Sequence, residues 1–293
     1  MLGLVGLFGL LAAGIAVDFI VGDEEVEGSD SDDTIQTGDG NDIINGNGGN
    51  DTLNGGAGDD TISGGTGNDD IFGEDGDDLL IGGEGVDDVI GADGSDQIVG
   101  GDGDDQLMGW GDDDQIFGGD GDDHLIGGEG DDILSGGAGD DTLEGGFDND
   151  EVTGGLGQDA IMGGGGDDIL SGVVQDPQSG EDLDERDYLN GGVGDDTIQV
   201  GNDDVVTGGE GQDNFLLGDW ISDGSAATIM DFNAAQDSLL IQYDGISEVE
   251  PEVTIESSDA DGEPQSQVFL DGLHIATLNG VGDLSVDQIT LIN

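Results

Sequence analysis

Aliphatic and acidic positions recur along this chain with a period of nine residues, without a gap from Gly28 to Ser171. The segment at 118–144 reads GGDGDDHLI, GGEGDDILS, GGAGDDTLE, which gives the pattern G-G-x-G-x-D-x-U-x with U aliphatic. Sixteen repeats fit this register; the sixth position is Asp in all of them and the eighth is Ile, Leu or Val. Such purity at fixed positions indicates that each nonapeptide is one structural unit of a repeat fold.

The period also predicts the local structure of each unit. The three residues x-U-x predict a short strand whose aliphatic side chain faces inward. The six residues before it predict a turn, because glycine tolerates positive φ. Two nonapeptides then bring the chain back to its start, displaced by about one strand spacing (~4.8 Å). The expected fold is all-β: a parallel β-roll solenoid with a small C-terminal β-rich cap and an apolar N-terminal segment.

Breaks in the pattern divide the chain into five segments. They are an apolar N-terminal segment at 1–22, a regular roll at 28–171, an insertion loop at 172–181, four less regular repeats at 182–216, and a β-rich cap at 217–293. One of the four later repeats has only eight residues, and the total is twenty. Strands are expected in the cap, because a solenoid needs its last coil covered. The expected strands are Leu239–Tyr243, Val268–Leu270, His274–Leu278 and Ile289–Ile292.

Composition excludes several classes of function. The chain has 72 Asp+Glu against one Lys+Arg, a formal net charge of −71, and no cysteine. Disulfides and thiolate metal sites are therefore excluded, and nucleic acid is not an expected partner because Arg186 is the only base. His124 and His274 are the only histidines, too few for a histidine-rich zinc site. His124 falls at position seven and is expected to face solvent.

The aspartate at position six of each repeat is the candidate metal ligand. Turn propensity alone would accept Asn, Ser or Gly there, and position five shows that tolerance with Val86, Ser95 and Gln158. Carboxylates stacked at ~4.8 Å match twice a Ca²⁺–oxygen distance of about 2.4 Å, and without a cation they would repel. The expected ligands, called the position-six aspartates below, are Asp33, Asp42, Asp51, Asp60, Asp69, Asp78, Asp87, Asp96, Asp105, Asp114, Asp123, Asp132, Asp141, Asp150, Asp159, Asp168, Asp187, Asp196, Asp204 and Asp213.

These nonapeptides resemble those of haemolysin-type calcium-binding (RTX) repeat proteins, and the resemblance covers residues 28–216. It implies a parallel β-roll that holds multiple Ca²⁺ ions in its turns, export in an unfolded state, and folding in extracellular calcium. The stretch ATIMDFNAAQDSLLI at 227–241 resembles an element that commonly follows such repeats; Asp231 and Asp237 there would hold one more ion or form a plain turn. The tail DLSVDQITLIN resembles an uncleaved C-terminal secretion signal.

The functional interpretation is a non-enzymatic, extracellular, secreted calcium-binding protein that folds on binding its ions. The alternative is a surface-anchored adhesin or matrix protein that uses the roll as a spacer. A calcium-dependent enzyme acting on polysaccharide is disfavoured, because Arg186 alone cannot neutralise uronate charge. Residues 2–21 are apolar except for Asp18; a cleaved signal, a membrane anchor in contact with lipid, and an apolar cap on the first coil all remain open.

Position nine, which the consensus leaves free, carries a run of apolar residues in the middle of the roll. Strand alternation predicts that these side chains point outward, in two rows because odd and even repeats lie on opposite sheets. Their β-propensity alone could account for them, or they could form a contact surface for self-association or a cell-surface partner. The seven residues are Phe72, Ile81, Ile90, Val99, Met108, Phe117 and Ile126.

Overall fold

The computed structural model describes residues 9–10, 16–17, 22–175, 180, 182–218, 220–221, 225–243, 251–260, 263–282 and 284–292. The chain forms two compact units, Met1–Thr142 and Leu143–Asn293. Each unit is a parallel β-solenoid, so the predicted fold class is confirmed. Among the described residues the one helix is a 3₁₀ turn, η1 (Val286–Gln288), and no helix is long and apolar enough to cross a membrane.

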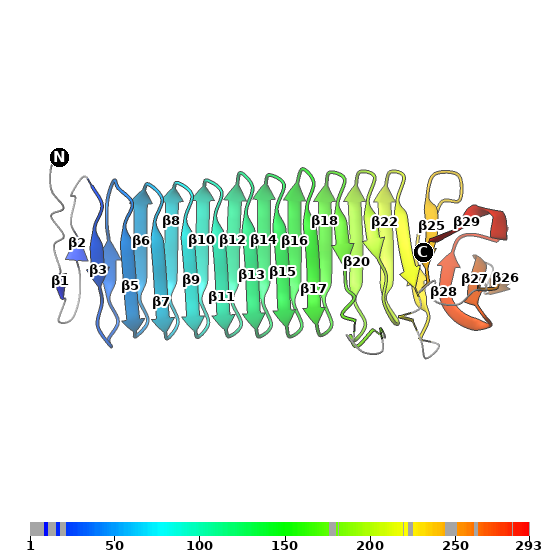
Figure 1. Ribbon diagram of the computed structural model, residues 1–293, viewed down its shortest axis with the longest axis horizontal. Helices are drawn as coiled ribbons and strands as arrows, with labels where there is room; N and C mark the ends of the chain where they lie inside the picture. Colours follow the sequence, from blue (N-terminus) through cyan, green and yellow to red (C-terminus); the bar gives the residue numbers. More distant parts are fainter. Residues whose placement is uncertain are drawn as a thin grey trace. The chain divides into compact units, whose positions relative to one another are not determined.

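In the first unit the strands alternate between two parallel sheets, and successive strands point in opposite directions (Figure 1). Neighbouring strands of one sheet are one coil of 18 residues apart, as the pairing of Val89 with Leu107 shows. One sheet contains β1 (Gly9–Leu10), β3 (Glu25–Glu27), β5 (Ile43–Gly48), β7 (Thr61–Thr66), β9 (Leu79–Glu84), β11 (Gln97–Asp102), β13 (Gln115–Asp120) and β15 (Ile133–Ala138). The other contains β2 (Ala16–Val17), β4 (Thr34–Gln36), β6 (Thr52–Ala57), β8 (Asp70–Asp75), β10 (Asp88–Asp93), β12 (Gln106–Gly111) and β14 (His124–Glu129).

The second unit has the same plan, and β16 (Thr142–Phe147) lies at the boundary between the units. Its coils are less uniform: Ala160 pairs with Tyr188, 28 residues on, and Tyr188 pairs with Val205, 17 residues on. One sheet contains β17 (Glu151–Leu156), β19 (Ile169–Ser171), β21 (Thr197–Gln199), β23 (Asn214–Gly218), β25 (Ser238–Gln242) and β29 (Ile289–Ile292). The other contains β18 (Ala160–Gly165), β20 (Tyr188–Val193), β22 (Val205–Glu210), β24 (Ala227–Ile229), β28 (Leu273–Asn279), β27 (Glu263–Leu270) and β26 (Val253–Ala260).

Most strands of the regular coils are six residues long, so the predicted three-residue strand with a six-residue turn is wrong. β10, for example, extends from position seven of one repeat to position three of the next, and Asp93 still pairs with Gly111. The reason is that the in–out alternation continues past position nine, which turns position one inward. Only positions four to six remain for the turn.

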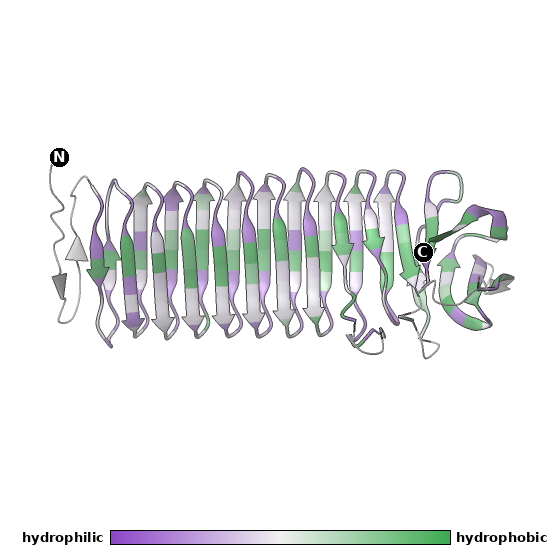
Figure 2. Ribbon diagram, viewed as in Figure 1, coloured by the Kyte–Doolittle hydropathy of each residue, from purple (hydrophilic) through white to green (hydrophobic). Residues whose placement is uncertain are grey.

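Within the repeats the core is formed by the hydrophobic side chains at position eight, as predicted. Leu80, Val89, Ile98 and Leu107 are all 0% exposed. Figure 2 shows these hydrophobic segments recurring on successive strands, with hydrophilic residues toward the turns. One aliphatic side chain per nine residues makes a thin core, which leaves room along its edges for the buried acidic groups described below.

The four strands predicted after the repeats are present as β25, β27, β28 and β29. The sequence missed β26, which forms an antiparallel hairpin with β27. β25 and β28 pair in parallel with β23 and β24 respectively, so the two sheets of the second unit continue into this region. At the other end, β1 and β2 pair with β3 and β4. Most of residues 2–21 lie outside the described residues, and their role as signal, anchor or cap remains a prediction.

Candidate functional site

The position-six aspartates are buried, although they lie where each turn meets the next strand. Their exposed fractions are between 0 and 3% at all twenty positions. Aspartates that only solvated the turns would be exposed, so this burial argues for a specific role. Carboxylates are seldom fully buried unless something compensates their charge.

One oxygen of each carboxylate holds the neighbouring coil. The backbone N–H of Asp33 donates a hydrogen bond of 2.8 Å to Oδ1 of Asp51, and the N–H of Asp51 donates one of the same length to Oδ1 of Asp69. The pattern persists where the period changes, because the N–H of Asp159 donates to Oδ1 of Asp187, 28 residues later. Position six thus carries a ladder of hydrogen bonds to charged acceptors along each edge of the roll.

The other oxygen, Oδ2, lies against the glycine at position one of its own repeat. A Cβ on Gly46 would lie 2.4 Å from Oδ2 of Asp51 and 2.5 Å from the carbonyl oxygen of Gly64, the equivalent residue of the next coil. Glycine is therefore required at position one to admit the carboxylate and a main-chain oxygen side by side. The exception, Thr37, donates its hydroxyl to the carbonyl oxygen of Gly55 at 2.6 Å.

Most of these Oδ2 atoms are buried and accept no hydrogen bond. An ionised carboxylate oxygen buried in this way is costly, because it has lost water without gaining a donor. The residues concerned include Asp42, Asp51, Asp60, Asp69, Asp78, Asp87, Asp96, Asp105, Asp114, Asp123, Asp168, Asp187 and Asp196.

The pKa values of these carboxyl groups report the same cost. Burial is the main cause that raises the pKa of Asp60 to about 7 and that of Asp114 to about 8. The position-six aspartates one coil before and one coil after, which stack with each of them in a column, also raise these pKa values. Burial also raises the pKa of Asp187 to about 9. In each case the N–H bond to the preceding coil opposes the shift without cancelling it. Without a cation, the folded roll therefore disfavours ionised position-six aspartates.

The donors around these columns fit calcium. Ca²⁺ takes six to eight oxygen ligands from carboxylates and carbonyls at 2.3–2.6 Å, and carboxylate Oδ2 atoms and main-chain carbonyl oxygens are what meet at position one. The chain has no cysteine. His124 lies on β14 at position seven, partly exposed and outside the columns. A hard cation that prefers oxygen is therefore the matching ion.

The structure adds residues to the columns that the sequence pattern missed. Glu24 precedes β3 at the place of a position-six aspartate, and its N–H donates to Oδ1 of Asp42 at 2.7 Å. The sequence does contain a signal for this residue, because Val26 lies two residues later, as the aliphatic residue of a repeat does. The repeat pattern required Asp at position six, so Glu24 was not recognised. Gly172 was assigned to the insertion, yet a Cβ there would lie 2.1 Å from Oδ2 of Asp187. Gly172 is thus the position-one glycine of the coil that the insertion interrupts.

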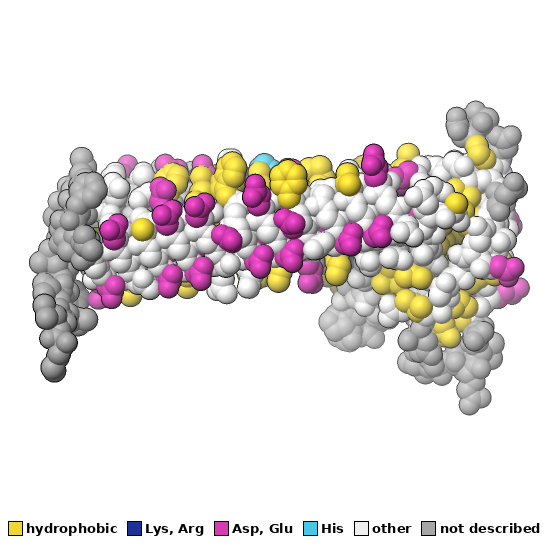
Figure 3. All heavy atoms as spheres, turned by 90° about the horizontal axis from the view of Figure 1, so that it is seen from above, with side chains coloured by type: hydrophobic (Ala, Val, Ile, Leu, Met, Phe, Trp, Pro, Cys, Tyr) yellow, Lys and Arg dark blue, Asp and Glu magenta, His cyan; other side chains and the backbone are white. Residues whose placement is uncertain are grey.

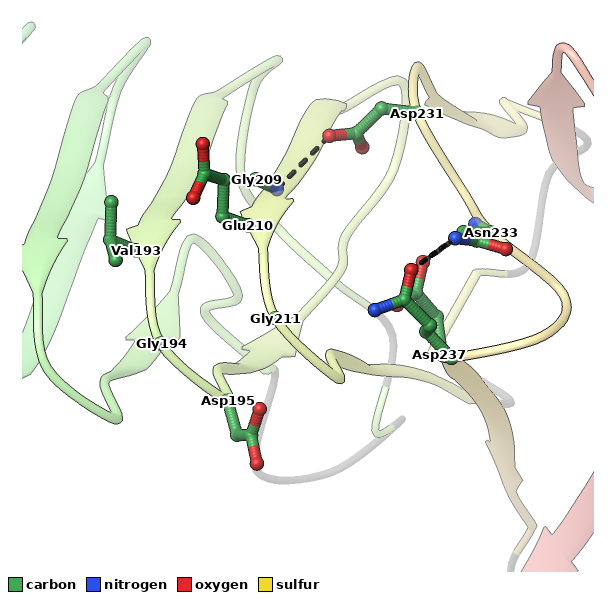
Figure 4. A pocket seen from close by; sticks show the side chains of 10 residues that line it. Val193, Gly194, Asp195, Gly209, Glu210, Gly211, Asp231, Asn233 and Asp237 are labelled. Atoms are coloured by element: carbon green, nitrogen blue, oxygen red, sulfur yellow. Dashed lines mark hydrogen bonds between the residues drawn. The ribbon is translucent and has the colours of Figure 1, made fainter.

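The predicted extra ion site at Asp231 and Asp237 is a loop whose carboxylates hold main-chain groups. Asp231 accepts the N–H groups of Gly208 and Gly209 at 2.9 and 3.0 Å, and Asp237 accepts those of Asn233 and Asp213 at 2.6 and 3.3 Å. Figure 4 shows both aspartates lining a pocket together with Glu210 and Asp195. The volume of this acidic pocket is about 640 Å³. Asp237 thereby takes the place of the next position-six aspartate.

The family model for the RTX calcium-binding nonapeptide repeat, which spans four copies, matches most of the chain. The matches lie at residues 20–53, 27–62, 54–89, 81–116, 90–125, 117–152, 135–170 and 183–215. The chain belongs to this family, which confirms the resemblance of its nonapeptides. Repeats of this family bind calcium, in agreement with the donor set of the columns.

Comparison with curated proteins finds no match. Among solved structures, the chain is similar to the AlgE6R3 subunit from the Azotobacter vinelandii mannuronan C5-epimerase. The two share 23% sequence identity over 53% of this chain and 80% of that one, with a TM-score of 0.31. At this level the likeness says nothing about the activity of this chain.

Proposed function

We propose that this chain is a non-enzymatic protein that acts outside the cell and folds when several Ca²⁺ ions bind between its stacked position-six aspartates. The observation that carries the proposal is the row of buried Oδ2 atoms without hydrogen-bond partners between Asp42 and Asp123. With one Lys+Arg for 72 Asp+Glu, the chain cannot neutralise these groups itself. A divalent cation supplies the missing charge.

The two carboxylate oxygens of each position-six aspartate have different roles. Oδ1 fixes the spacing of successive coils through the N–H bond, while Oδ2 and the nearby carbonyl oxygen are the groups offered to an ion. A bound Ca²⁺ supplies positive charge that offsets the repulsion of two stacked carboxylates. Because an aspartate such as Asp105 has neighbours in the coils before and after it, binding one ion orders half of the next site. Folding is therefore expected to be cooperative in calcium.

The kind of site supports an extracellular role. Sites of this type, assembled from separate turns of an open chain, belong with the weak calcium modules that respond in the range of about 10⁻⁴–10⁻³ M. The absence of cysteine removes disulfides as an alternative source of stability. A chain of such charge stays open until calcium is abundant, which suits export before folding.

Far-UV circular dichroism during a calcium titration of the full chain tests the folding step. We expect a steep transition from an open chain to β-structure, and no equivalent transition in magnesium, which demands octahedral geometry and gives up its water reluctantly. Assay of culture supernatant and membrane fractions tests the location. Equal folding in magnesium alone, or a chain that is folded without any divalent ion at neutral pH, would refute the proposal.

A second function, as an interaction surface, is favoured by the apolar side chains on the outer face of the first unit. The register places Ile90 beside Phe72 and Met108, with Ile126 next in line, so the predicted row exists. On the opposite sheet Val99 lies between Ile81 and Phe117. Figure 3 looks down on one row of turns and shows hydrophobic side chains gathered along one edge, beside the carboxylates.

Trp110, on β12 next to this row, adds to the surface. Its side chain is 60% exposed and its φ is 86°, a left-handed conformation that costs a bulky residue energy. Its neighbours along the sheet are Ala92 and Gly128, which leave the indole open to a partner. Sedimentation of the triple variant Phe72→Ser, Ile90→Ser, Met108→Ser in saturating calcium tests this function. The interaction function would be excluded if the wild type, like the triple variant, were monomeric and bound no cell-surface material.

A further inference from the structure

The segment between the insertion and β20 turns one of its carboxylates toward the position-six aspartates. One carboxylate oxygen each from Asp159, Asp184 and Asp187 lies within 4.8 Å of the other two. Asp159 and Asp187 are position-six aspartates of adjacent coils, whereas Asp184 belongs to the segment that follows the insertion. This is the one such three-residue group among the described residues.

Two hydrogen bonds hold the Asp184 side chain in this inward position. Its Oδ1 accepts the N–H of Gly157 at 2.8 Å and that of Glu185 at 2.9 Å. In a regular coil the equivalent glycine donates instead to a main-chain carbonyl, as Gly121 does to Ala138 at 2.8 Å. The carboxylate has thus replaced a carbonyl oxygen, and its Oδ2 remains buried without a hydrogen-bond partner.

Asp187 gives an independent indication that this group requires a ligand. Its side chain is 0% exposed, its Oδ1 accepts the N–H of Asp159 at 2.8 Å, and its Oδ2 has no hydrogen-bond partner. The only Arg or Lys of the chain, Arg186, is adjacent in sequence but turns away. Its guanidinium donates to the carbonyl oxygen of Asp203 at 3.0 Å and lies 3.8 Å from the carboxylate of that residue. Arg186 therefore does not compensate the charges of Asp184 and Asp187.

We propose that Asp159, Asp184 and Asp187 form a three-carboxylate site for a divalent cation of the calcium type, with a higher affinity than the sites of the regular coils. The inference rests on the proposed function for the identity of the ion. Affinity for Ca²⁺ rises with the number of charged ligands and with the rigidity of the site. Here a third carboxylate joins the two that stacking supplies, and its own hydrogen bonds fix its position.

Such a site has a consequence for the order of folding. Because Asp184 bonds to Gly157 and follows the insertion, an ion here joins the coils on both sides of the interruption. These coils would otherwise be the hardest to close, since the insertion adds length to the loop between Gly172 and Asp187. The tight site therefore places the first ion where the repeat pattern is weakest.

The test is equilibrium dialysis of the full chain against buffered free Ca²⁺, comparing wild type with Asp184→Asn and Glu185→Gln. Asn keeps an oxygen that accepts from Gly157 but lacks the charge. Glu185 is exposed, adjacent, and accepts a hydrogen bond from the Gln158 side chain at 2.9 Å, so its amide variant is a matched control for charge. In the wild type and in Glu185→Gln we expect about one Ca²⁺ per chain to bind at a free Ca²⁺ concentration roughly tenfold or more below the midpoint of the main folding transition. In Asp184→Asn we expect this tightly bound ion to be absent.

The outcomes separate this inference from the proposed function. Absence of calcium binding in the wild type would overturn both. The three-carboxylate site alone would be overturned if the wild type showed the main folding transition but no tightly bound ion. It would also be overturned if Asp184→Asn kept the tightly bound ion. If Asp184→Asn fails to fold in saturating calcium, Asp184→Glu decides: it keeps the charge and is expected to keep the tightly bound ion, whereas folding without that ion would overturn the inference.

Discussion

The backbone N–H of Asp87 donates a hydrogen bond of 2.8 Å to Oδ1 of Asp105, the aspartate one coil later. At the adjacent position five the direction is reversed, because the N–H of Asp122 donates to Oδ1 of Asp104, one coil earlier, at 3.1 Å. The two ladders differ in exposure as well: Asp105 is 1% exposed, whereas Asp104 lies on the surface. Position six is the place where we propose that the ions bind, while position five faces solvent in the same turns, and this contrast supplies matched controls.

Asp114→Asn separates the charge of a position-six aspartate from its hydrogen bond. Asn can still accept the N–H of Asp96, which now bonds to Asp114 Oδ1 at 2.8 Å. Because burial raises the pKa of Asp114 to about 8, removing the charge should stabilise the ion-free fold at pH 8, by roughly 1–3 kcal/mol. The same change removes a ligand and should raise the calcium midpoint roughly two- to tenfold.

Asp113→Asn is the control for this experiment, since Asp113 is exposed at position five of the same repeat. It should change neither quantity by a comparable amount. The pH at which the ion-free protein loses its β-structure in chelator measures the first effect, and it should rise in Asp114→Asn. A calcium titration measures the second effect, and both experiments are followed by circular dichroism. An Asp114→Asn variant that destabilises the ion-free fold, or that leaves the calcium midpoint unchanged, would contradict the assignment.

The ion-free protein should fold in acid and unfold in base. Burial raises the pKa of Asp51 to about 6, that of Asp60 to about 7 and that of Asp114 to about 8, from an ordinary value of 3.8. Protonation therefore favours the folded state: the stabilisation is complete below about pH 4 and is lost as the pH rises through 6–8. A circular dichroism titration in chelator from pH 5 to 9, above the pI of about 4.1, should show β-structure decreasing with pH.

Saturating calcium should reverse that profile. A bound ion requires ionised carboxylates, so the calcium-loaded protein should be most stable at neutral to basic pH and lose its ions on acidification. An ion-free protein whose β-content is independent of pH between 5 and 9 would show that the buried carboxyl groups do not control folding.

Gly100→Ala should damage the roll, whereas Gly111→Ala should be tolerated. A Cβ on Gly100 would lie 2.4 Å from Oδ2 of Asp105 and 2.7 Å from the carbonyl oxygen of Gly118. A Cβ on Gly111 would meet nothing closer than the carbonyl oxygen of Ala92 at 3.7 Å. We expect Gly100→Ala to cost about 1–3 kcal/mol in saturating calcium and to weaken calcium binding. Thermal unfolding of the two variants with calcium measures this, and equal stabilities would show that position one does not need glycine for the carboxylate.

Much of this arrangement is readable from the period of nine alone. The aliphatic at position eight and the aspartate at position six are in place at every predicted coil, and the outward row around Ile90 follows from strand alternation. What the period could not show is how far each strand extends. The strands are longer than predicted because position one turns inward and continues the alternation. The reason for glycine at position one becomes clear only from the structure, in which the position-six carboxylate packs against it.

The remaining differences arise where the chain departs from its own pattern. Glu24 continues the ladder in the coil before the first recognised repeat, because its N–H makes the same bond as an aspartate would. Asp184 reaches the column only through the path of the loop after the insertion, which no spacing encodes. The hairpin of β26 and β27 lies outside the nonapeptide repeats, so the repeat pattern does not predict it either. Local periodicity predicts the roll, but interrupted segments depend on tertiary contacts.

The most direct test compares two triple variants in a calcium titration followed by far-UV circular dichroism. Asp87→Asn, Asp105→Asn and Asp123→Asn remove three charges from one buried column while keeping an oxygen for the N–H ladder. Asp104→Asn, Asp122→Asn and Asp140→Asn remove three charges from the exposed position five, in the coils of Asp105 and Asp123 and in the coil that follows. We expect the first variant to lose the cooperative transition or shift its midpoint by about tenfold or more, and the second to fold near the wild-type concentration. Equal midpoints for the two variants would contradict the claim that buried position-six aspartates bind the ions that fold this protein.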